Sequence, residues 1–364
     1  MTNELRRIIE TGDGTRVSFT QRAGLRLVTV SSRVRPQVAR VLAIHGLGDH
    51  AGRHIAHARR LAAAGFTTTM VELAGHGGQP GEWPETMAVY EAYARSDRPA
   101  DLLSYFRDER AFPQAYREHL ANRQYARLAG TSAIEHLAQV SAAIEQLDHI
   151  DAGTAGLPLF VLGHSMGALL AHETMFRIPA RARARIAGLV LIAPAFAPQG
   201  NPASPAMQLA VNGLWSLRRF PVSPTRTAAK ALLDLNFPVD TTWGKKWLTD
   251  VDIEVELFVT DPLVPRRLPT RYANSIESLM AAASRRGARV PYDAVVLLPA
   301  RDGITSRGAA VDFVRRANHA AGTTRVSMAT FDVVAHDLLR SSARDGALSA
   351  IEQWLDGRAH ARAA

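Results

Sequence analysis

The residues best placed to do chemistry occur in the order serine, aspartate, histidine along the 364-residue chain. Ser165 is the centre of GHSMG (163 to 167), which fits the pattern G-x-S-x-G. In this pattern a sharp turn between a strand and a helix exposes the serine hydroxyl, and glycines avoid the collisions a β-carbon would cause. The apolar LFVL before the motif and ALLAHETMF after it supply that strand and helix. We therefore predict Ser165 as a nucleophile.

A serine nucleophile needs a base and an acid that orients the base. Among thirteen histidines, His336 is favoured because it follows the strand-like RVSMATF after a short connection. Asp302 comes at the end of the apolar AVVLLPA, before a turn, and is the predicted acid. Asp293 lies at the wrong end of that strand, Asp332 is too close in sequence to the base, and Asp337 is adjacent to it and would point away.

Acyl transfer also requires donors for the oxyanion, each worth about 3 kcal/mol. The residue after the nucleophile, Met166, supplies one backbone N–H at the start of a helix. The second is expected from the turn HGLG (45 to 48) after the first buried strand, with Leu47 as the donor. The alternative for that turn is an ordinary glycine turn. Serine, base, acid and donors need no metal and no cofactor.

These residues must be positioned by strands and helices that alternate along the chain. An antiparallel hairpin (TRVSFTQ and LRLVTVSS, with Gly24 near its turn) is followed by buried strands at 38–45, 66–73, 159–163, 188–194, 292–298 and 325–331. The expected helices lie at 56–64, 131–147, 165–176, 306–318 and 343–354. This pattern predicts an α/β fold with a mostly parallel, doubly wound sheet, whose ligands bind beyond the carboxyl ends of the strands.

Two stretches interrupt the alternation. Residues 82–130 are rich in tyrosine (Tyr90, Tyr93, Tyr105, Tyr116 and Tyr125), and we expect them to form helices that narrow the mouth of the site. Residues 197–290 carry Trp215, Trp243 and Trp247 and are the predicted cap or lid. The core is then assembled from residues 1–81, 131–196 and 291–364. For both stretches the alternative is a packed helical embellishment.

Composition limits the function classes. No cysteine is present, which excludes disulfides and thiolate nucleophiles. Neither a signal peptide nor a membrane-spanning run is recognisable, so we expect a cytoplasmic protein. The net charge of +9 is mostly arginine, which we interpret as a solvated surface, with peripheral contact with anionic membranes as the alternative. We expect no nucleic-acid partner, since no such motif occurs. The sequence does not indicate an oligomeric state.

Seven segments, taken together and in order, resemble the monoacylglycerol lipase and lysophospholipase branch of the α/β-hydrolases, grouped with serine aminopeptidase-like hydrolases. They are HGLGDHAGRH (45 to 54), ELAGHGGQPG (72 to 81), GHSMGALLAHE (163 to 173), GLVLIAPAF (188 to 196), VTDPLV (259 to 264), ARDGITSRGA (300 to 309) and AHDLL (335 to 339). The resemblance implies the same nucleophile, acid, base and oxyanion donors, and a cap that shapes an acyl pocket.

The sequence departs from the pattern of this branch at Asp49 (usually Glu), His54 (Tyr), Glu72 (Asp), Ala168 (Gly) and Arg340 (an acid), and by the stretch 82–130. None of these changes touches the predicted nucleophile, base or acid. The resemblance therefore implies a serine hydrolase that cleaves small-molecule or lipid esters with an apolar acyl chain, such as a monoacylglycerol or lysophospholipid. The alternatives are an acyltransferase or thioesterase with the same residues, and a non-catalytic binding protein of the same fold.

Overall fold

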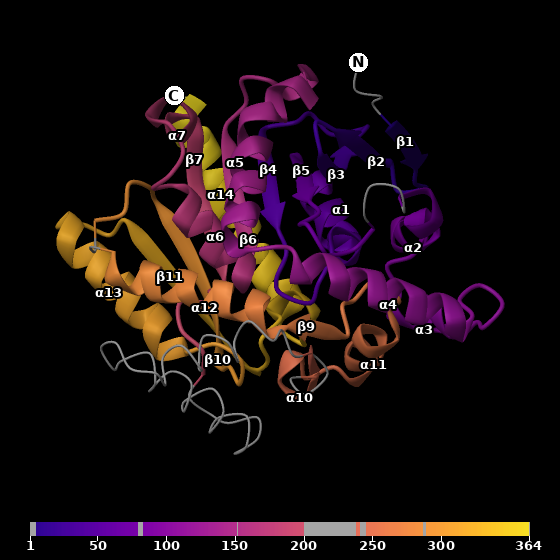
Figure 1. The fold of residues 1–364 in the computed structure, drawn as a ribbon. Coiled ribbons are helices and arrows are strands. Elements are labelled where there is room, and N and C mark those ends of the chain that lie inside the picture. The colour runs from indigo at the N-terminus through magenta and orange to yellow at the C-terminus, as the bar shows by residue number, and fades with distance from the viewer. Residues whose placement is uncertain are drawn as a thin grey trace, which may run out of the picture.

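A nine-stranded mixed sheet forms the centre of the computed structural model, which describes residues 5–78, 83–150, 152–199, 238–240, 245–286 and 289–363. Helices cover both faces of the sheet (Figure 1). The strand order is β1-β2-β3-β5-β4-β6-β7-β10-β11. The strands are β1 (Leu5–Glu10), β2 (Thr15–Arg22), β3 (Leu25–Ser32), β4 (Ala39–Ile44), β5 (Phe66–Val71), β6 (Leu159–His164), β7 (Ile186–Ile192), β10 (Ala294–Arg301) and β11 (Val326–Val334).

The predicted hairpin is confirmed as β2 and β3, which pair antiparallel around Ala23 and Gly24. Both turn residues have positive φ (48° and 78°), as a two-residue turn that follows the twist of the strands requires. Strand β1, which the sequence did not predict, pairs antiparallel with β2. From β5 to β11 all neighbouring strands are parallel, which confirms the doubly wound α/β class.

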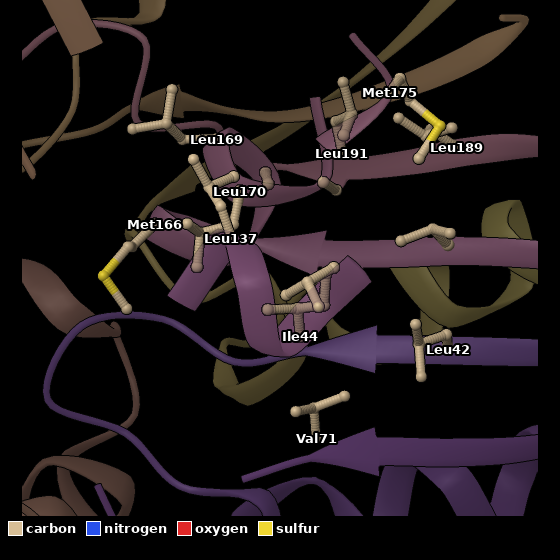
Figure 2. Close-up of a cluster of buried hydrophobic side chains, with 14 of the residues drawn as sticks. Leu42, Ile44, Val71, Leu137, Met166, Leu169, Leu170, Met175, Leu189 and Leu191 are labelled. Atoms are coloured by element: carbon tan, nitrogen blue, oxygen red, sulfur yellow. The ribbon is translucent and has the colours of Figure 1, made fainter. Parts of the chain in front are cut away.

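The parallel strands are buried on both faces, and alternate residues contribute to different cores. Leu42 and Leu191 belong to the cluster covered by α5 (Ala133–Ile150), α6 (Met166–Thr174) and α13 (Arg307–Ala321). Val41 and Val190 belong to the cluster covered by α1 (Ile55–Ala63) and α14 (Arg344–Ala363). Figure 2 shows the first cluster, with Leu170 of α6 among the strand side chains. These two layers hold the strand ends in place.

The two stretches that interrupt the alternation gather along one edge of the molecule (Figure 1). The first forms α2 (Trp83–Arg95), α3 (Pro99–Arg107) and α4 (Gln114–Ala129). The described part of the second forms β8 (Pro238–Asp240), α10 (Lys245–Leu248), α11 (Asp252–Thr260), β9 (Arg267–Pro269) and α12 (Thr270–Arg285). Trp215 and Trp243 lie outside the described residues. Among the helices described, none has both the length and the apolar composition that crossing a bilayer requires.

The sheet order places a crevice beside the predicted nucleophile. From β4 the chain passes to β5 on one side, whereas β6 lies on the other side of β4. The loops after β4 and β6 therefore run in opposite directions from neighbouring strand ends, and such a switch point is where ligands bind in parallel sheets. Leu47 follows β4 and Ser165 follows β6.

Candidate active site

Ser165 occupies a strained turn between β6 and α6. Its backbone angles are φ 54° and ψ −117°, a region that costs a non-glycine residue on the order of 1–3 kcal/mol. A β-carbon on Gly163 would overlap the Gly167 carbonyl, and one on Gly167 would overlap the Ile44 carbonyl of β4. The predicted elbow is therefore present, and both motif glycines are required by close backbone approach.

Ser165 lies at a cavity of about 160 Å³ at the carboxyl edge of the sheet. Most of the lining surface is apolar, and the polar lining residues come from α10 and from several strand ends, those of β4, β6, β10 and β11. The lining includes Gly46, Leu47, Asp49, Arg53, His164, Met166, Lys245, Leu248, Phe258, Leu268, Ile276, Met280, Thr305, His336 and Asp337. A mostly apolar concavity with a few polar groups is the usual form of a small-molecule site.

The structure brings His336 and Asp302 together at this cavity. Nδ1 of His336 lies 2.8 Å from Oδ2 of Asp302, and both side chains are buried. Asp302 is fixed in turn by the N–H groups of Ile304 and Thr305, at 2.7 and 3.0 Å, and by the Thr305 hydroxyl at 2.8 Å. Because Nδ1 faces a carboxylate, it carries a proton, which leaves Nε2 as the basic atom of the neutral ring.

The two groups shift one another's pKa. Burial disfavours the charged form of Asp302, but the adjacent imidazole and the N–H donors outweigh it and hold the pKa of Asp302 below its usual value. Burial likewise opposes protonation of His336, yet the Asp302 carboxylate raises the pKa of His336 above its usual value. A carboxylate that stays ionised beside a more basic imidazole is the pairing a general base requires.

The loop that carries His336 is held by the second stretch. The backbone N–H groups of His336 and Asp337 both donate to the carbonyl oxygen of Leu248 in α10, at 3.0 and 2.8 Å. Trp247 packs against the Asp302 loop, since a β-carbon on Gly303 would collide with its ring. The described part of the predicted cap therefore positions the base and the acid, as well as lining the cavity.

The two predicted oxyanion donors are the backbone N–H groups of Leu47 and Met166. Leu47 and Met166 both line the cavity with Ser165. Met166 is the first residue of α6, where helix N–H groups lack intrahelical acceptors. Within the described residues neither N–H donates to a protein acceptor, so both are available to a ligand. The Ser165 hydroxyl also makes no protein hydrogen bond in that part of the chain.

The three carboxylates that sequence analysis rejected as the acid make other contacts. Asp293 pairs with Arg358 at 3.0 Å, at the opposite end of β10. Asp332 is exposed on β11. Asp337 accepts the N–H of Leu339 at 3.1 Å and so caps a short helix instead of contacting the His336 ring.

One group beside the cavity has the residue types of a metal site, namely Asp49, His164 and Asp337. Cations of the chain already neutralise its carboxylates. Arg53 Nε lies 2.9 Å from Asp49, and Arg340 Nε lies 3.6 Å from Asp337. We therefore assign the two carboxylates to ion pairs in the wall of the cavity.

The described part of the tyrosine-rich stretch packs against the cap and does not line the cavity. None of its described residues lines the cavity, so the structure does not support the expectation that it narrows the mouth. It packs on the cap instead, through hydrogen bonds from Tyr93 to Asp261, Arg117 to the Thr260 carbonyl and Gln124 to the Leu263 carbonyl. Sequence reasoning missed these contacts and those of Leu248, since backbone acceptors leave no sequence signal.

Solved structures have the same fold. A monoacylglycerol lipase from Paleococcus ferrophilus is 20% identical, with 92% of this chain and 99% of that chain covered and a TM-score of 0.61. A soluble variant of monoglyceride lipase from Saccharomyces cerevisiae is 14% identical, with 94% of each chain covered and a TM-score of 0.65. A carboxyl esterase from Bacillus coagulans is 15% identical, covers 99% and 100%, and has a TM-score of 0.55. They confirm the α/β-hydrolase fold.

A search of curated protein sequences finds no match. The sequence model of one family, however, matches residues 35–96 and 129–342, which is more than half of the chain. The matched ranges contain all five predicted site residues, and the interruption at 97–128 falls inside the tyrosine-rich stretch. With the fold and the order of strand-end loops in agreement, the chain belongs to the α/β-hydrolase family described as serine aminopeptidase, S33.

Proposed function

We propose that this protein is a serine hydrolase that cleaves carboxylic esters with an apolar acyl chain, in the manner of a monoacylglycerol lipase or lysophospholipase. The observation that carries the proposal is the 2.8 Å contact between His336 and Asp302 at the cavity of Ser165. Membership of a hydrolase family and the lipase and esterase fold neighbours support an ester hydrolase. Residue roles and substrate are our assignment.

In the proposed mechanism, Nε2 of His336 removes the proton of the Ser165 hydroxyl as Oγ attacks the ester carbonyl carbon. The N–H groups of Leu47 and Met166 donate to the oxyanion of the tetrahedral intermediate. When the intermediate collapses, His336 gives its proton to the leaving alcohol oxygen, and the acyl group remains on Ser165. A water molecule, deprotonated by His336, then attacks the acyl carbon. As the bond between that carbon and Oγ breaks, His336 returns the proton to Ser165, and the carboxylic acid leaves.

The walls of the cavity support an amphiphilic substrate. Leu268 of β9, with Ile276 and Met280 of α12, forms an apolar wall, against which an acyl chain would lose its contact with water at about 0.8 kcal/mol per methylene. Arg53 and Lys245 also line the cavity and supply polar surroundings for an alcohol headgroup. Contact with anionic membranes and a cytoplasmic location stay predictions.

The test is Ser165→Ala, assayed with p-nitrophenyl butyrate and with a tagged fluorophosphonate. We expect turnover and labelling to be lost, because both need the serine oxygen. Ser141→Ala on α5, where the hydroxyl bonds to its own helix, is the matched control and should keep both. Retained turnover in Ser165→Ala would refute the assignment. Adding an alcohol acceptor separates hydrolysis from transfer, with free acid expected as the product.

A further inference from the structure

We propose that Tyr90, on α2, is a positioning residue for the oxyanion donor Leu47, acting through Glu72 and His45. The inference rests on the proposed function, since it explains how one of the two proposed donors is aimed. Three consecutive contacts carry it, from the loop after β4 to the loop after β5 and then to α2.

The first contact orients the peptide that contains the donor. Nδ1 of His45 lies 2.9 Å from the carbonyl oxygen of Gly46, and because a carbonyl only accepts, Nδ1 is the donor. That carbonyl and the N–H of Leu47 belong to the same peptide bond, which is trans, so the two groups point in opposite directions. Anchoring the carbonyl on the buried side therefore turns the Leu47 N–H away from His45, toward the cavity.

The second contact holds the His45 ring. Glu72 Oε1 lies 3.2 Å from His45 Nε2, and both side chains are buried. Burial alone would lower the pKa of His45, but the Glu72 carboxylate outweighs burial and raises it. The backbone N–H of Leu73, the residue after Glu72, also donates to Nε2 of His45, at 3.2 Å. Nε2 therefore accepts, and Nδ1 carries the ring proton that it donates to the Gly46 carbonyl. Rotation of the ring would release the Gly46–Leu47 peptide.

The third contact fixes the carboxylate. The Tyr90 hydroxyl donates to Glu72 Oε2 at 2.5 Å and accepts the N–H of Gly78 at 2.8 Å. The backbone N–H of Ala51 also donates to Oε2, at 3.2 Å. Tyr90 and Glu72 are 0% and 1% exposed, so water cannot replace the phenol if it is removed. Loss of the hydroxyl would leave Glu72 with fewer donors and a looser hold on His45.

Tyr93 provides a matched control on the same helix. Its hydroxyl donates to the buried carboxylate of Asp261 at 2.5 Å, and its side chain is 3% exposed. The same carboxylate oxygen of Asp261 lies 2.9 Å from Nε2 of His50. This chain of contacts is different from the one that leads through Glu72 and His45 to the Gly46 carbonyl. Removal of either hydroxyl breaks a buried bond from α2 to a carboxylate, yet only Tyr90 leads to the oxyanion donor.

The experiment compares Tyr90→Phe, Glu72→Gln and Tyr93→Phe in ester hydrolysis and in binding of a boronic acid, whose tetrahedral adduct places an oxygen at the oxyanion position. We expect Tyr90→Phe and Glu72→Gln to lower kcat by about fivefold or more, with KM nearly unchanged. The affinity for the boronic acid should fall by a similar factor. Tyr93→Phe should leave both unchanged while lowering Tm. In the double variant Tyr90→Phe/Glu72→Gln, the fold-loss in kcat should be smaller than the product of the two single losses, because the two residues act in one chain of contacts.

A Tyr90→Phe enzyme with wild-type kcat and boronic acid affinity would overturn the inference and leave Tyr90 a purely structural residue. If that variant failed to fold, Glu72→Gln would decide by the same two readouts. The outcome is separable from the proposed function. Loss of activity in Ser165→Ala with no effect at Tyr90 and Glu72 refutes only the positioning role, whereas activity retained in Ser165→Ala refutes the proposed function itself.

Discussion

Arg340, four residues after His336, lies 3.0 Å from Glu254 of α11, and both side chains are buried. The same guanidinium donates to the backbone carbonyl of Arg53 and lies 3.6 Å from Asp337. One buried cation thus joins the loop of the predicted base, the described part of the cap and the segment after the oxyanion loop.

Replacing Arg340 by methionine should destabilise the fold strongly. The substitution leaves Glu254 and Asp337 buried without their cation, and breaking one partner of a buried pair typically costs about 3–5 kcal/mol. Urea denaturation would measure the loss. Arg107→Met is the control, because Arg107 also pairs with a glutamate of α11 at 2.8 Å, but both partners are largely exposed, and such pairs contribute about 1 kcal/mol or less. Equal losses in the two variants would contradict the expectation.

The pH profile of kcat/KM should report the raised pKa of His336. The base must be neutral to accept the serine proton, so activity is present above its pKa and is lost as pH falls through it. Since Asp302 raises that pKa, the midpoint of the acid limb should lie above the ordinary value of about 6.5. Asp302→Asn should move the midpoint lower and reduce kcat by about 10⁴-fold.

The control for that profile is Asp293→Asn, a carboxylate at the far end of β10 that pairs with Arg358. It should leave the midpoint and kcat unchanged. An unshifted midpoint in Asp302→Asn would mean that the acid limb belongs to another group.

Met280→Trp should shift the enzyme toward shorter acyl chains. Met280 lines the apolar wall of the cavity, and the larger ring would fill space that the far methylenes of a long chain need. We expect kcat/KM to fall at least tenfold for a p-nitrophenyl ester of a long acid and to change little for the acetate. Ser278→Trp, on the exposed side of the same helix, should not alter the preference. A uniform change at all chain lengths would place the acyl chain elsewhere.

Two of the residues that depart from the related branch bind one another. Asp49 and His54, each unusual at its position, are joined by a 2.7 Å contact, and Arg53 lies 2.9 Å from the same carboxylate. Arg340 likewise meets Glu254 and Asp337. Asp49, His54 and Arg340 thus make polar contacts beside the site, and none of them replaces Ser165, Asp302 or His336.

Local patterns in the sequence predicted the fold class correctly and are the basis of the proposed site residues. The continuous apolar runs predicted the parallel strands, and Gly24 marked the hairpin turn. Because the carboxyl ends of parallel strands meet at one edge, the order of Ser165, Asp302 and His336 on loops after three strands already predicted their convergence. In the structure Ser165 and His336 line one cavity, and Asp302 contacts His336.

Only the tertiary structure decided what holds these residues. The contacts of Tyr90 with Glu72, of Leu248 with the backbone of His336, and of Arg340 with Glu254 join segments 18, 88 and 86 residues apart. Periodicity reports which face of an element is buried, but it carries no information about which distant element covers that face. The sequence therefore determined which groups we propose for the chemistry, and packing between distant segments determined how the structure holds them.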